Sequence, residues 1–222
     1  MKKYLDLFMH TDLFRGITES ELTAMLNCLS AEQRIYQKGE AVFRRGEHIA
    51  SVAMLLKGCI HIQKEDFWGN LSILSVISEG DVFGEVYACL GNEEIINNAV
   101  AVRQSEVLFL DINRIITMCP SGCQFHGRLI RNLLSVIATK NKILTQKLEH
   151  MSRRTTREKL LSYLSEQSLR AGTPSFEIPL NRQQLADYLA VDRSAMSNEL
   201  CKMRDEGILM FEKNRFILSR HC

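Results

Sequence analysis

The stretch Leu180–Ile208, LNRQQLADYLAVDRSAMSNELCKMRDEGI, decides the fold of the C-terminal part of this chain. Its pattern predicts two short amphipathic helices joined by a tight turn, the arrangement of a helix-turn-helix. Asn181 precedes the first helix, and Gln184 three residues later completes an Asx variant of the capping box. The dipeptide Ala190-Val191 then makes the turn, and Asp192 can cap the second helix. The stretch therefore predicts a unit that places one helix in the major groove of DNA.

The second helix has an apolar and a polar side. Met196, Leu200 and Met203 recur at helical spacing and are expected to face inward. The residues expected to face outward and contact bases are Arg193, Ser194, Ser197 and Asn198. Arginine can bond bidentately to guanine, and asparagine can do the same to adenine. A plain helical hairpin with a solvated polar side is the alternative, but caps, turn and apolar face all agree with the DNA-binding unit.

The segment after Gly207 predicts a β-hairpin, and hence a wing. Two short apolar runs, 209–211 and 215–218, flank the turn Glu212-Lys213-Asn214. Gly207 itself is placed to end the preceding helix. We expect the basic residues Lys213, Arg215 and, at the start of the first helix, Arg182 to bind DNA.

Charge is distributed unevenly along the chain. Residues 1–120 carry 11 Lys and Arg against 16 Asp and Glu, a net charge of −5. Residues 121–222 carry 17 against 10, a net charge of +7. This asymmetry suits a polyanion-binding part attached to a mildly acidic one, although a solvated basic face would also produce it.

Length and cysteine use set the broad class. A chain of 222 residues suits two domains that each bury a core. Asp6 and Asp12 interrupt any apolar region after Lys2-Lys3, which argues against a signal peptide, and apolar runs such as Val52–Leu56 are too short to cross a bilayer. The seven scattered cysteines favour reduced thiols over a disulfide framework. We therefore expect a cytoplasmic protein that does not bind a membrane.

The N-terminal half is predicted to be mostly β. A capping box at Thr18 and Glu21 opens a short helix that runs to about Leu29. Short strands then alternate with glycine-bearing turns. The expected strands are Arg34–Tyr36, Ala41–Phe43, Val52–Leu56, Cys59–Gln63, Leu71–Val76, Asn98–Val102 and Val107–Leu110. This pattern favours a double-stranded β-roll, or jelly roll, over residues 1–120.

A long helix is expected over residues 121–151. A heptad seam runs along it, with spacings of four and three: Ile130, Leu134, Ile137, Asn141, Leu144, Leu148 and Met151. One asparagine in such a seam fixes register and a two-stranded state. A second stripe, expected to pack on the roll, consists of Leu129, Leu133, Val136 and Ile143. One broad apolar face within a monomer is the alternative, but a helix-turn-helix usually binds two half-sites and needs two-fold symmetry.

The boundary of the last domain is marked by a fresh capping box at Thr155 and Glu158. We expect the hinge near Ser152–Thr155, a helix from there to about Leu169, and a loop at Ala171–Ser175. The predicted fold is α+β, with a β-roll sensor (1–120), a dimerisation helix (121–151) and a winged helix-turn-helix (152–222).

This order of roll, long helix and winged helix-turn-helix resembles the cyclic-AMP receptor protein and fumarate–nitrate regulator (Crp/Fnr) family. The segments that carry the resemblance are Gly39-Glu40, Gly46-Glu47, Gly58, Gly80-Asp81-Val82-Phe83-Gly84-Glu85 and Val191–Ser197. The resemblance implies a homodimeric transcription regulator that binds a palindromic double-stranded operator and contacts RNA polymerase. In it, an effector or redox change in the cyclic-nucleotide-binding-like roll repositions the long helices and the DNA-contacting helices.

The residues at the expected effector pocket depart from the family pattern. Members that bind cyclic AMP follow the Gly-Glu loop with an Arg-Ser pair, whereas the corresponding place here has Asn97-Asn98. Two amides cannot supply the charge or fork of a guanidinium, so we expect no tight cyclic-AMP binding and leave the effector unidentified. The candidate pocket residues are Gly84, Glu85, Asn97, Asn98 and Asn141. The two asparagines could equally be turn residues, and Glu85 a structural cap.

Cysteines offer a redox or metal alternative. Iron–sulfur members of the family carry a cysteine cluster near the N-terminus; this chain has only Cys28 before Cys59, so we expect no such cluster. Cys119 and Cys123, with His126 nearby, have a loose metal-like spacing, but free cysteine is commonly a small core residue.

Cys59 and His61 form a second pair, on one face of a predicted strand. We expect Ile60 and Ile62 to face inward and this pair outward.

An enzyme and an effector-independent DNA-binding dimer are the two alternative function classes. An enzyme on a cupin-type roll would need clustered histidine and carboxylate ligands, and the six histidines are dispersed, so we predict no catalytic and no metal residues. An effector-independent DNA-binding dimer would differ from a sensor in lacking a ligand-dependent change in operator affinity, and this possibility stays open.

Overall fold

The computed structural model describes residues 2–69, 71–117 and 124–219. The chain divides into two compact units, Met1–Thr139 and Lys140–Cys222, called here the N-terminal and C-terminal units. The division falls inside helix α5 (Gln124–Met151), and the hinge expected near Ser152–Thr155 stays a prediction. The three-part division at residues 120 and 151 stays a prediction.

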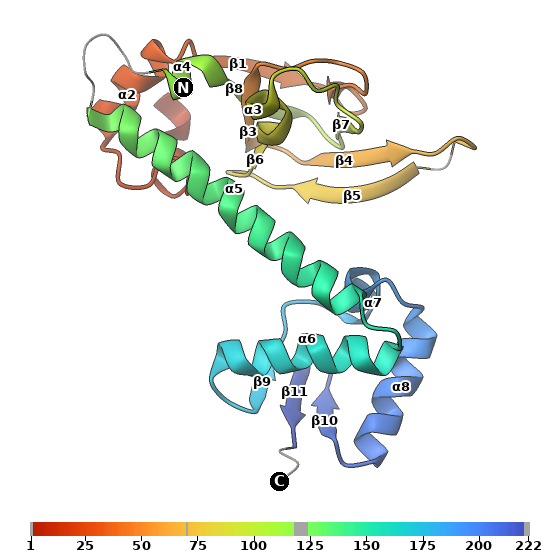
Figure 1. Cartoon of the computed structure of the whole chain (residues 1–222). Coiled ribbons are helices and arrows are strands. Elements are labelled where there is room, and N and C mark those ends of the chain that lie inside the picture. The colour runs from red at the N-terminus through yellow and green to blue at the C-terminus, as the bar shows by residue number, and fades with distance from the viewer. Residues whose placement is uncertain (1, 70, 118–123, 220–222) are drawn as a thin grey trace. The chain divides into compact units, whose positions relative to one another are not determined.

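The N-terminal unit is built on two four-stranded antiparallel sheets, which confirms the predicted β-roll (Figure 1). The first sheet has the order β1-β8-β3-β6, formed by Glu32–Tyr36, Ser105–Asp111, Ser51–Lys57 and Val82–Phe83. The second has the order β2-β7-β4-β5, formed by Ala41–Phe43, Asn98–Ala101, Ile60–Glu65 and Leu71–Ile77. Most neighbours in these orders are distant in the sequence, so long-range pairing holds the roll together.

Strand β3 belongs to two cores at once. Its even-numbered residues Val52, Met54 and Leu56 are buried among the N-terminal helices and the start of α5. Its odd-numbered residues Ala53 and Leu55 are buried between the two sheets. Successive side chains of a strand point to opposite faces, which explains why a strand covered on both sides is continuously apolar in sequence.

Short helices cover the first sheet. They are η1 (Lys2–Tyr4), α1 (Leu5–Met9), α2 (Glu19–Cys28), α3 (Glu85–Leu90) and α4 (Ile112–Ile116). The predicted capping box is present, because Thr18 accepts from the backbone of Glu21 while the Glu21 carboxylate accepts from the backbone of Thr18.

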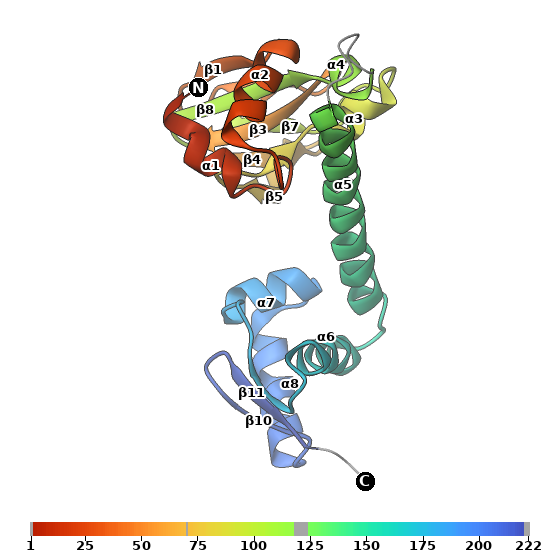
Figure 2. The same ribbon diagram turned by 90° about the vertical axis from the view of Figure 1, so that its left-hand side faces the viewer.

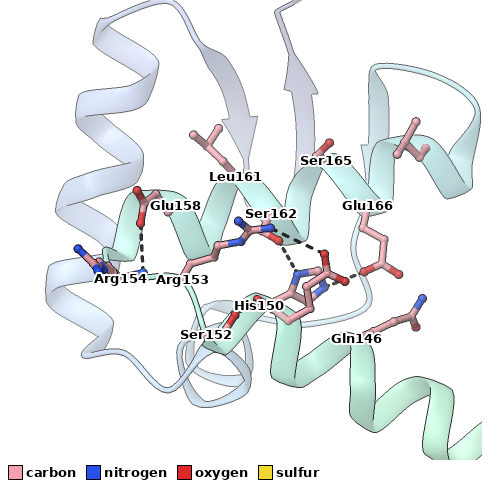
Figure 3. Close-up of a pocket in the computed structure, with 12 residues that line it drawn as sticks. Gln146, His150, Ser152, Arg153, Arg154, Glu158, Leu161, Ser162, Ser165 and Glu166 are labelled. Carbon is pink, nitrogen blue, oxygen red and sulfur yellow. Dashed lines mark hydrogen bonds and ion pairs between the residues drawn. The ribbon is translucent and has the colours of Figure 1, made fainter.

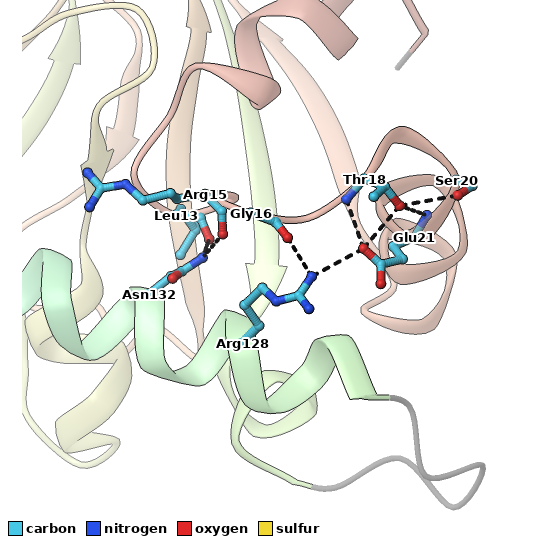
Figure 4. A network of polar contacts seen from close by, with 8 residues as sticks. All are labelled: Leu13, Arg15, Gly16, Thr18, Ser20, Glu21, Arg128 and Asn132. Carbon is cyan, nitrogen blue, oxygen red and sulfur yellow. Dashed lines mark hydrogen bonds and ion pairs between the residues drawn. The ribbon is translucent and has the colours of Figure 1, made fainter.

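The first turns of α5 are fixed to the N-terminal segment by polar contacts (Figure 4). Asn132 donates to the carbonyls of Leu13 and Arg15 at 3.0 and 2.9 Å. Arg128 donates to the Gly16 carbonyl and forms an ion pair with Glu21 at 3.3 Å. These bonds, together with the buried apolar side of the helix, hold this end of α5 against the roll.

The second apolar stripe of α5 behaves as predicted in its first three members. Leu129 and Leu133 are buried in the core of the N-terminal unit, and Val136 is partly buried there. Ile143 is 55% exposed and belongs to the C-terminal unit, so its packing on the roll stays a prediction.

The C-terminal unit contains three helices and a small sheet. The helices are α6 (Thr156–Ala171), α7 (Arg182–Leu189) and α8 (Arg193–Asp205). The sheet has the antiparallel order β10-β11-β9, formed by Leu209–Glu212, Arg215–Leu218 and Ser175–Glu177. The β10–β11 hairpin lies next to α8 (Figure 2). The expected loop Ala171–Ser175 ends at the first residue of β9, and no strand was expected there, because a three-residue strand paired only with a distant partner gives little local signal.

Among the helices of the described ranges, none has the length and apolar character needed to span a membrane.

Candidate nucleic-acid interface

The turn between α7 and α8 holds the two helices at a fixed angle. Ala190 adopts the left-handed conformation with φ 50° and ψ 59°, which costs a non-glycine residue about 1–2 kcal/mol. The backbone of Val191 donates to the Ala186 carbonyl at 3.0 Å. Lys159 on α6 donates to the carbonyls of Leu189 and Ala190 at 3.2 and 3.4 Å, so a third helix supports the strained turn.

Helix α8 has the two sides that the sequence predicts. Met196, Leu200 and Met203 are fully buried in the core of the C-terminal unit. Arg193, Ser194 and Asn198 are exposed on the opposite side. Ser197, expected to face outward, is half-buried, and its hydroxyl donates to the Arg193 carbonyl at 2.9 Å. The exposed side chains cluster in the first two turns, where a helix entering the major groove contacts base edges.

Asp192 fixes the start of α8. Its carboxylate accepts from the Ser194 hydroxyl at 2.5 Å and from the Ala195 backbone N–H at 2.8 Å. These hydrogen bonds hold the pKa of Asp192 below its ordinary value, because they favour the charged form. The cap therefore stabilises the end of α8 that carries the candidate DNA contacts.

The wing carries two of the predicted basic residues on its surface. Lys213 and Arg215 are both exposed, and Lys213 takes a positive φ of 52° at the hairpin turn. Asn214 anchors that turn by donating to Glu177 at 2.7 Å and to the Ile178 carbonyl at 3.2 Å.

Arg182 lies elsewhere than we expected. Its guanidinium lies over the rings of Phe211 and Phe216, 4.8 and 4.9 Å from their centres, and the side chain is half-buried. Burial lowers the pKa of Arg182, because desolvation disfavours the charged form. The structure thus places this arginine among the aromatic residues of the wing, where it packs α7 against the hairpin. A DNA contact by Arg182 remains only a prediction.

A polar cleft of about 880 Å³ lies between the end of α5 and α6 (Figure 3). His150 is 3% exposed at its edge, with Ser162 at 2.9 Å from Nδ1 and Glu166 at 2.7 Å from Nε2. The His150 ring also packs nearly perpendicular to Tyr163 and at a tilt against Tyr188, and burial raises the pKa of Tyr163 to about 12. These contacts fix the last turn of α5 to α6 and α7, and sequence spacing did not reveal them.

The predicted effector-pocket residues are placed by the roll in different ways. Gly84 has φ 76°, and a Cβ there would lie 2.7 Å from the Phe43 ring, so the position needs glycine. Glu85 is buried as the first residue of α3. The side-chain oxygen of Asn98 accepts from the Arg45 backbone N–H at 2.9 Å, whereas the side-chain amide oxygen Oδ1 of Asn97 is buried without a hydrogen-bond partner among the described residues.

Asn141 is the pocket residue that the roll does not hold. It is exposed on α5 within the C-terminal unit, and its side chain accepts from Thr145 at 3.3 Å. Arg103, the basic residue nearest in sequence to the two asparagines, donates to the Gly58 carbonyl at 2.8 Å. The Arg103 guanidinium is therefore already engaged by the backbone.

The heptad seam of α5 divides into exposed and covered members. Leu134, Leu144 and Leu148 are 62%, 58% and 58% exposed, and Asn141 between them is also exposed. The half-buried members are Ile130, Ile137 and Met151, the first two against the core of the N-terminal unit.

The candidate metal and redox residues are not clustered where they are described. Ile60 and Ile62 face the core between the sheets, as predicted, and Cys59 and His61 are half-buried beside them. Cys119 and Cys123 lie outside the described residues. His126 is buried, with Nε2 at 2.9 Å from the Arg114 carbonyl. Within the described ranges, no three His, Cys, Asp or Glu side chains group in a way that could hold a metal ion.

Comparison with known proteins matches both parts of the chain. The sequence model of the cyclic nucleotide-binding domain matches residues 33–121, and that of the Crp-like helix-turn-helix domain matches residues 158–221. Transcriptional activator protein FnrL of Cereibacter sphaeroides is 20% identical over 194 residues, 83% of this chain and 75% of that protein. The cGMP-dependent protein kinase 2 of Homo sapiens is 24% identical over 114 residues, which are 51% of this chain but 14% of the kinase.

Two solved structures share the fold over most of their length. The catabolite activator protein of Thermus thermophilus superposes with a TM-score of 0.54 at 21% identity, covering 94% of each chain. CprK complexed with OCPA superposes with a TM-score of 0.63 at 19% identity, covering 91% of this chain and 92% of that one.

Roll, long helix and winged helix-turn-helix together define a DNA-binding transcription regulator with an effector-binding domain. Both family matches fall on the parts that the structure assigns to these roles. The chain belongs to the Crp/Fnr family.

Proposed function

We propose that this protein is a homodimeric, sequence-specific transcription regulator whose operator affinity is controlled by a small effector in the roll. The observation that carries the proposal is the first part of α8, where Arg193, Ser194 and Asn198 are exposed while the apolar side of the same helix is fully buried. Base contacts by these residues would give specificity, and Lys213 and Arg215 on the wing would add sequence-independent phosphate contacts.

The homodimer is supported by the exposed leucines of α5. Leu134, Leu144 and Leu148 expose more than half of their surface on one helix, at the spacing of a two-stranded coiled coil. Pairing with a second copy would cover them and would bring two α8 helices to the two halves of a palindrome.

The effector is proposed to be something other than cyclic AMP. No arginine of the sequence stands at the Asn97-Asn98 position, and Arg103 is bonded to the backbone of Gly58. The unpartnered side-chain amide oxygen Oδ1 of Asn97 would accept a hydrogen bond from a ligand donor. CprK, which has the same fold, is complexed with OCPA. This supports the proposal that proteins of this fold can bind ligands other than cyclic AMP.

The second candidate function is an effector-independent DNA-binding dimer. It is favoured by the turn role of Asn98, which accepts from the backbone of Arg45 and so needs no ligand to explain its presence. A redox response through Cys59, Cys119 or Cys123 is a further possibility on the same DNA-binding scaffold. In each case we propose that the protein acts in the cytoplasm, with RNA polymerase as a partner.

The test is a binding titration with DNA enriched from a random library by the full chain. We expect a palindromic sequence, two chains per duplex, and an affinity at least about a thousandfold above that for random DNA. Calorimetry with cyclic AMP should show no micromolar binding. Equal affinity for enriched and random DNA would refute the sequence-specific function, and a single chain per duplex would refute the homodimer.

A further inference from the structure

Arg157 is a basic residue that the capping pattern of α6 does not explain. It lies in the first turn of α6, beside Glu158, but its side chain extends to another helix. Its Nε donates to Glu199 at 2.5 Å, while Nη1 and Nη2 donate to the two carboxylate oxygens of Glu206, each at 2.7 Å. Both glutamates belong to α8 or its C-terminal cap, so one guanidinium spans α6 and the DNA-binding helix.

This contact differs from an ordinary surface ion pair in its geometry. Isolated exposed pairs contribute little, whereas bidentate and networked arginine–carboxylate pairs hold their partners in fixed directions. Arg157 uses three N–H groups on three carboxylate oxygens of two glutamates, and the Glu199 side chain is only 19% exposed. Glu206 raises the pKa of Arg157 further above its ordinary value, with Glu199 adding to this, and Arg157 in turn lowers that of Glu206. These shifts favour the charged forms of Arg157 and Glu206 that make the bidentate pair.

The position of Glu199 connects this network to the DNA contacts. Glu199 directly follows the exposed Asn198 on α8 and directly precedes the buried Leu200, so it lies at the border between the exposed and the buried side of the helix. Holding Glu199 from α6 fixes the rotation of α8 about its own axis, and with it the direction in which Asn198 and Arg193 point.

We propose that Arg157 is a positioning residue that sets the sequence specificity of α8. It acts through Glu199 and Glu206 and contacts no base itself. This inference rests on the proposed DNA-binding function.

The experiment compares Arg157→Gln with wild type on two probes, the enriched palindrome and random DNA of equal length. We expect Arg157→Gln to lose operator affinity by on the order of tenfold, the size expected when one base contact per half-site is misaligned. Random DNA should be bound with nearly unchanged affinity, because phosphate contacts depend little on the rotation of α8. Arg157→Lys should not rescue the loss, since an ammonium group cannot form the bidentate fork.

The control variant is Arg170→Gln. Arg170 is likewise an arginine of α6 and is exposed, but it pairs with Glu166 on its own helix and with Gln146. It should leave the ratio of operator to random affinity unchanged. Thermal unfolding of each variant shows whether a loss of operator affinity comes from misfolding or from misalignment of α8. Glu206→Gln is measured as well, because it removes only one of the two partners of Arg157.

The triple variant Arg157→Gln/Glu199→Gln/Glu206→Gln separates orientation from charge. We expect it to keep the loss of discrimination, because the anchor is still missing. Restored discrimination in this variant would overturn the positioning role. An equal loss of affinity on both probes for Arg157→Gln, or no loss at all, would also overturn it. If wild type itself shows no operator preference, the proposed function fails and this inference fails with it; a wild-type preference that Arg157→Gln leaves intact refutes this inference alone.

Discussion

The N-terminal roll and the C-terminal helix-turn-helix differ in how far along the chain their deciding contacts reach. In the roll, β1 pairs with β8, so Glu32 lies opposite Phe109. In the C-terminal unit, the helix starts are decided within three residues, as at Asn181 with Gln184 and at Asp192 with Ala195. The comparison teaches that the DNA-binding part can be recognised from local pattern, whereas the sensor part acquires its cores only when distant strands meet.

The largest expected effect concerns the helix that runs through both units. Leu144→Lys places a charge in the exposed stripe of α5, so we expect monomers and a loss of palindrome affinity of roughly a hundredfold or more, since the second half-site no longer adds avidity. Light scattering and a binding titration measure the two effects. Leu169→Lys, at an 80% exposed leucine of α6, is the control and should stay dimeric. A dimeric mass for Leu144→Lys would contradict the seam.

The next effect tests the long-range packing of the roll. Gly84→Ala should destabilise the N-terminal unit by about 2–3 kcal/mol, because the new methyl meets the Phe43 ring and the backbone has a positive φ. Gly39→Ala is the matched control: its φ is 86°, but nothing lies within 4 Å of the added carbon, so only about 1 kcal/mol should be lost. Urea unfolding monitored by circular dichroism compares them, and equal losses would show that packing at Gly84 does not matter.

The third effect tests the local DNA-binding surface. Arg193→Ala should lose roughly 1–3 kcal/mol of operator binding and relax specificity at one base pair per half-site. Competition titrations with operators changed at single positions measure it. An equal loss on random DNA would identify Arg193 as a phosphate contact instead.

The fourth effect concerns the strained turn between α7 and α8. Ala190→Gly should stabilise the C-terminal unit by up to about 1 kcal/mol, because glycine adopts a positive φ without a steric cost. Ala195→Gly, inside α8, is the opposite control and should destabilise by about 1 kcal/mol. Thermal unfolding measures both changes in stability. A lower melting temperature for Ala190→Gly than for wild type would contradict the prediction that the Ala190 backbone is strained.

The smallest effect is a pH dependence at Asp192. Its pKa is lowered from 3.8 in the folded state, so its stabilising contribution is present above that value and is lost as the pH falls through the folded-state pKa. Asp192→Ala should therefore be less stable than wild type at neutral pH, and the difference should shrink in acid below pH 3.8. A difference that does not change with pH would rule out the charged cap.

The sequence predicted most of the elements and the buried and exposed sides of α8, and it failed where contacts are non-local. The capping boxes at Thr18, Thr155 and Asn181 are all present, because each needs only a neighbour three residues away. Strand β9 and the stacking of Arg182 on two wing aromatics were missed, because both depend on residues brought together by folding.

By itself, the sequence determined the class of protein, the helix starts, and the polar and apolar sides of α8, since these follow from periodicity and short-range capping. Only the tertiary structure decided that Arg157 binds the two glutamates of α8 and its cap, that His150 lies buried beside Glu166, and that Arg182 of α7 stacks on two aromatic rings of the wing. The physical reason is that a charged side chain has no preferred partner along the chain. The packing of the helices determines its partner, because packing brings a particular opposite charge or aromatic ring within contact distance.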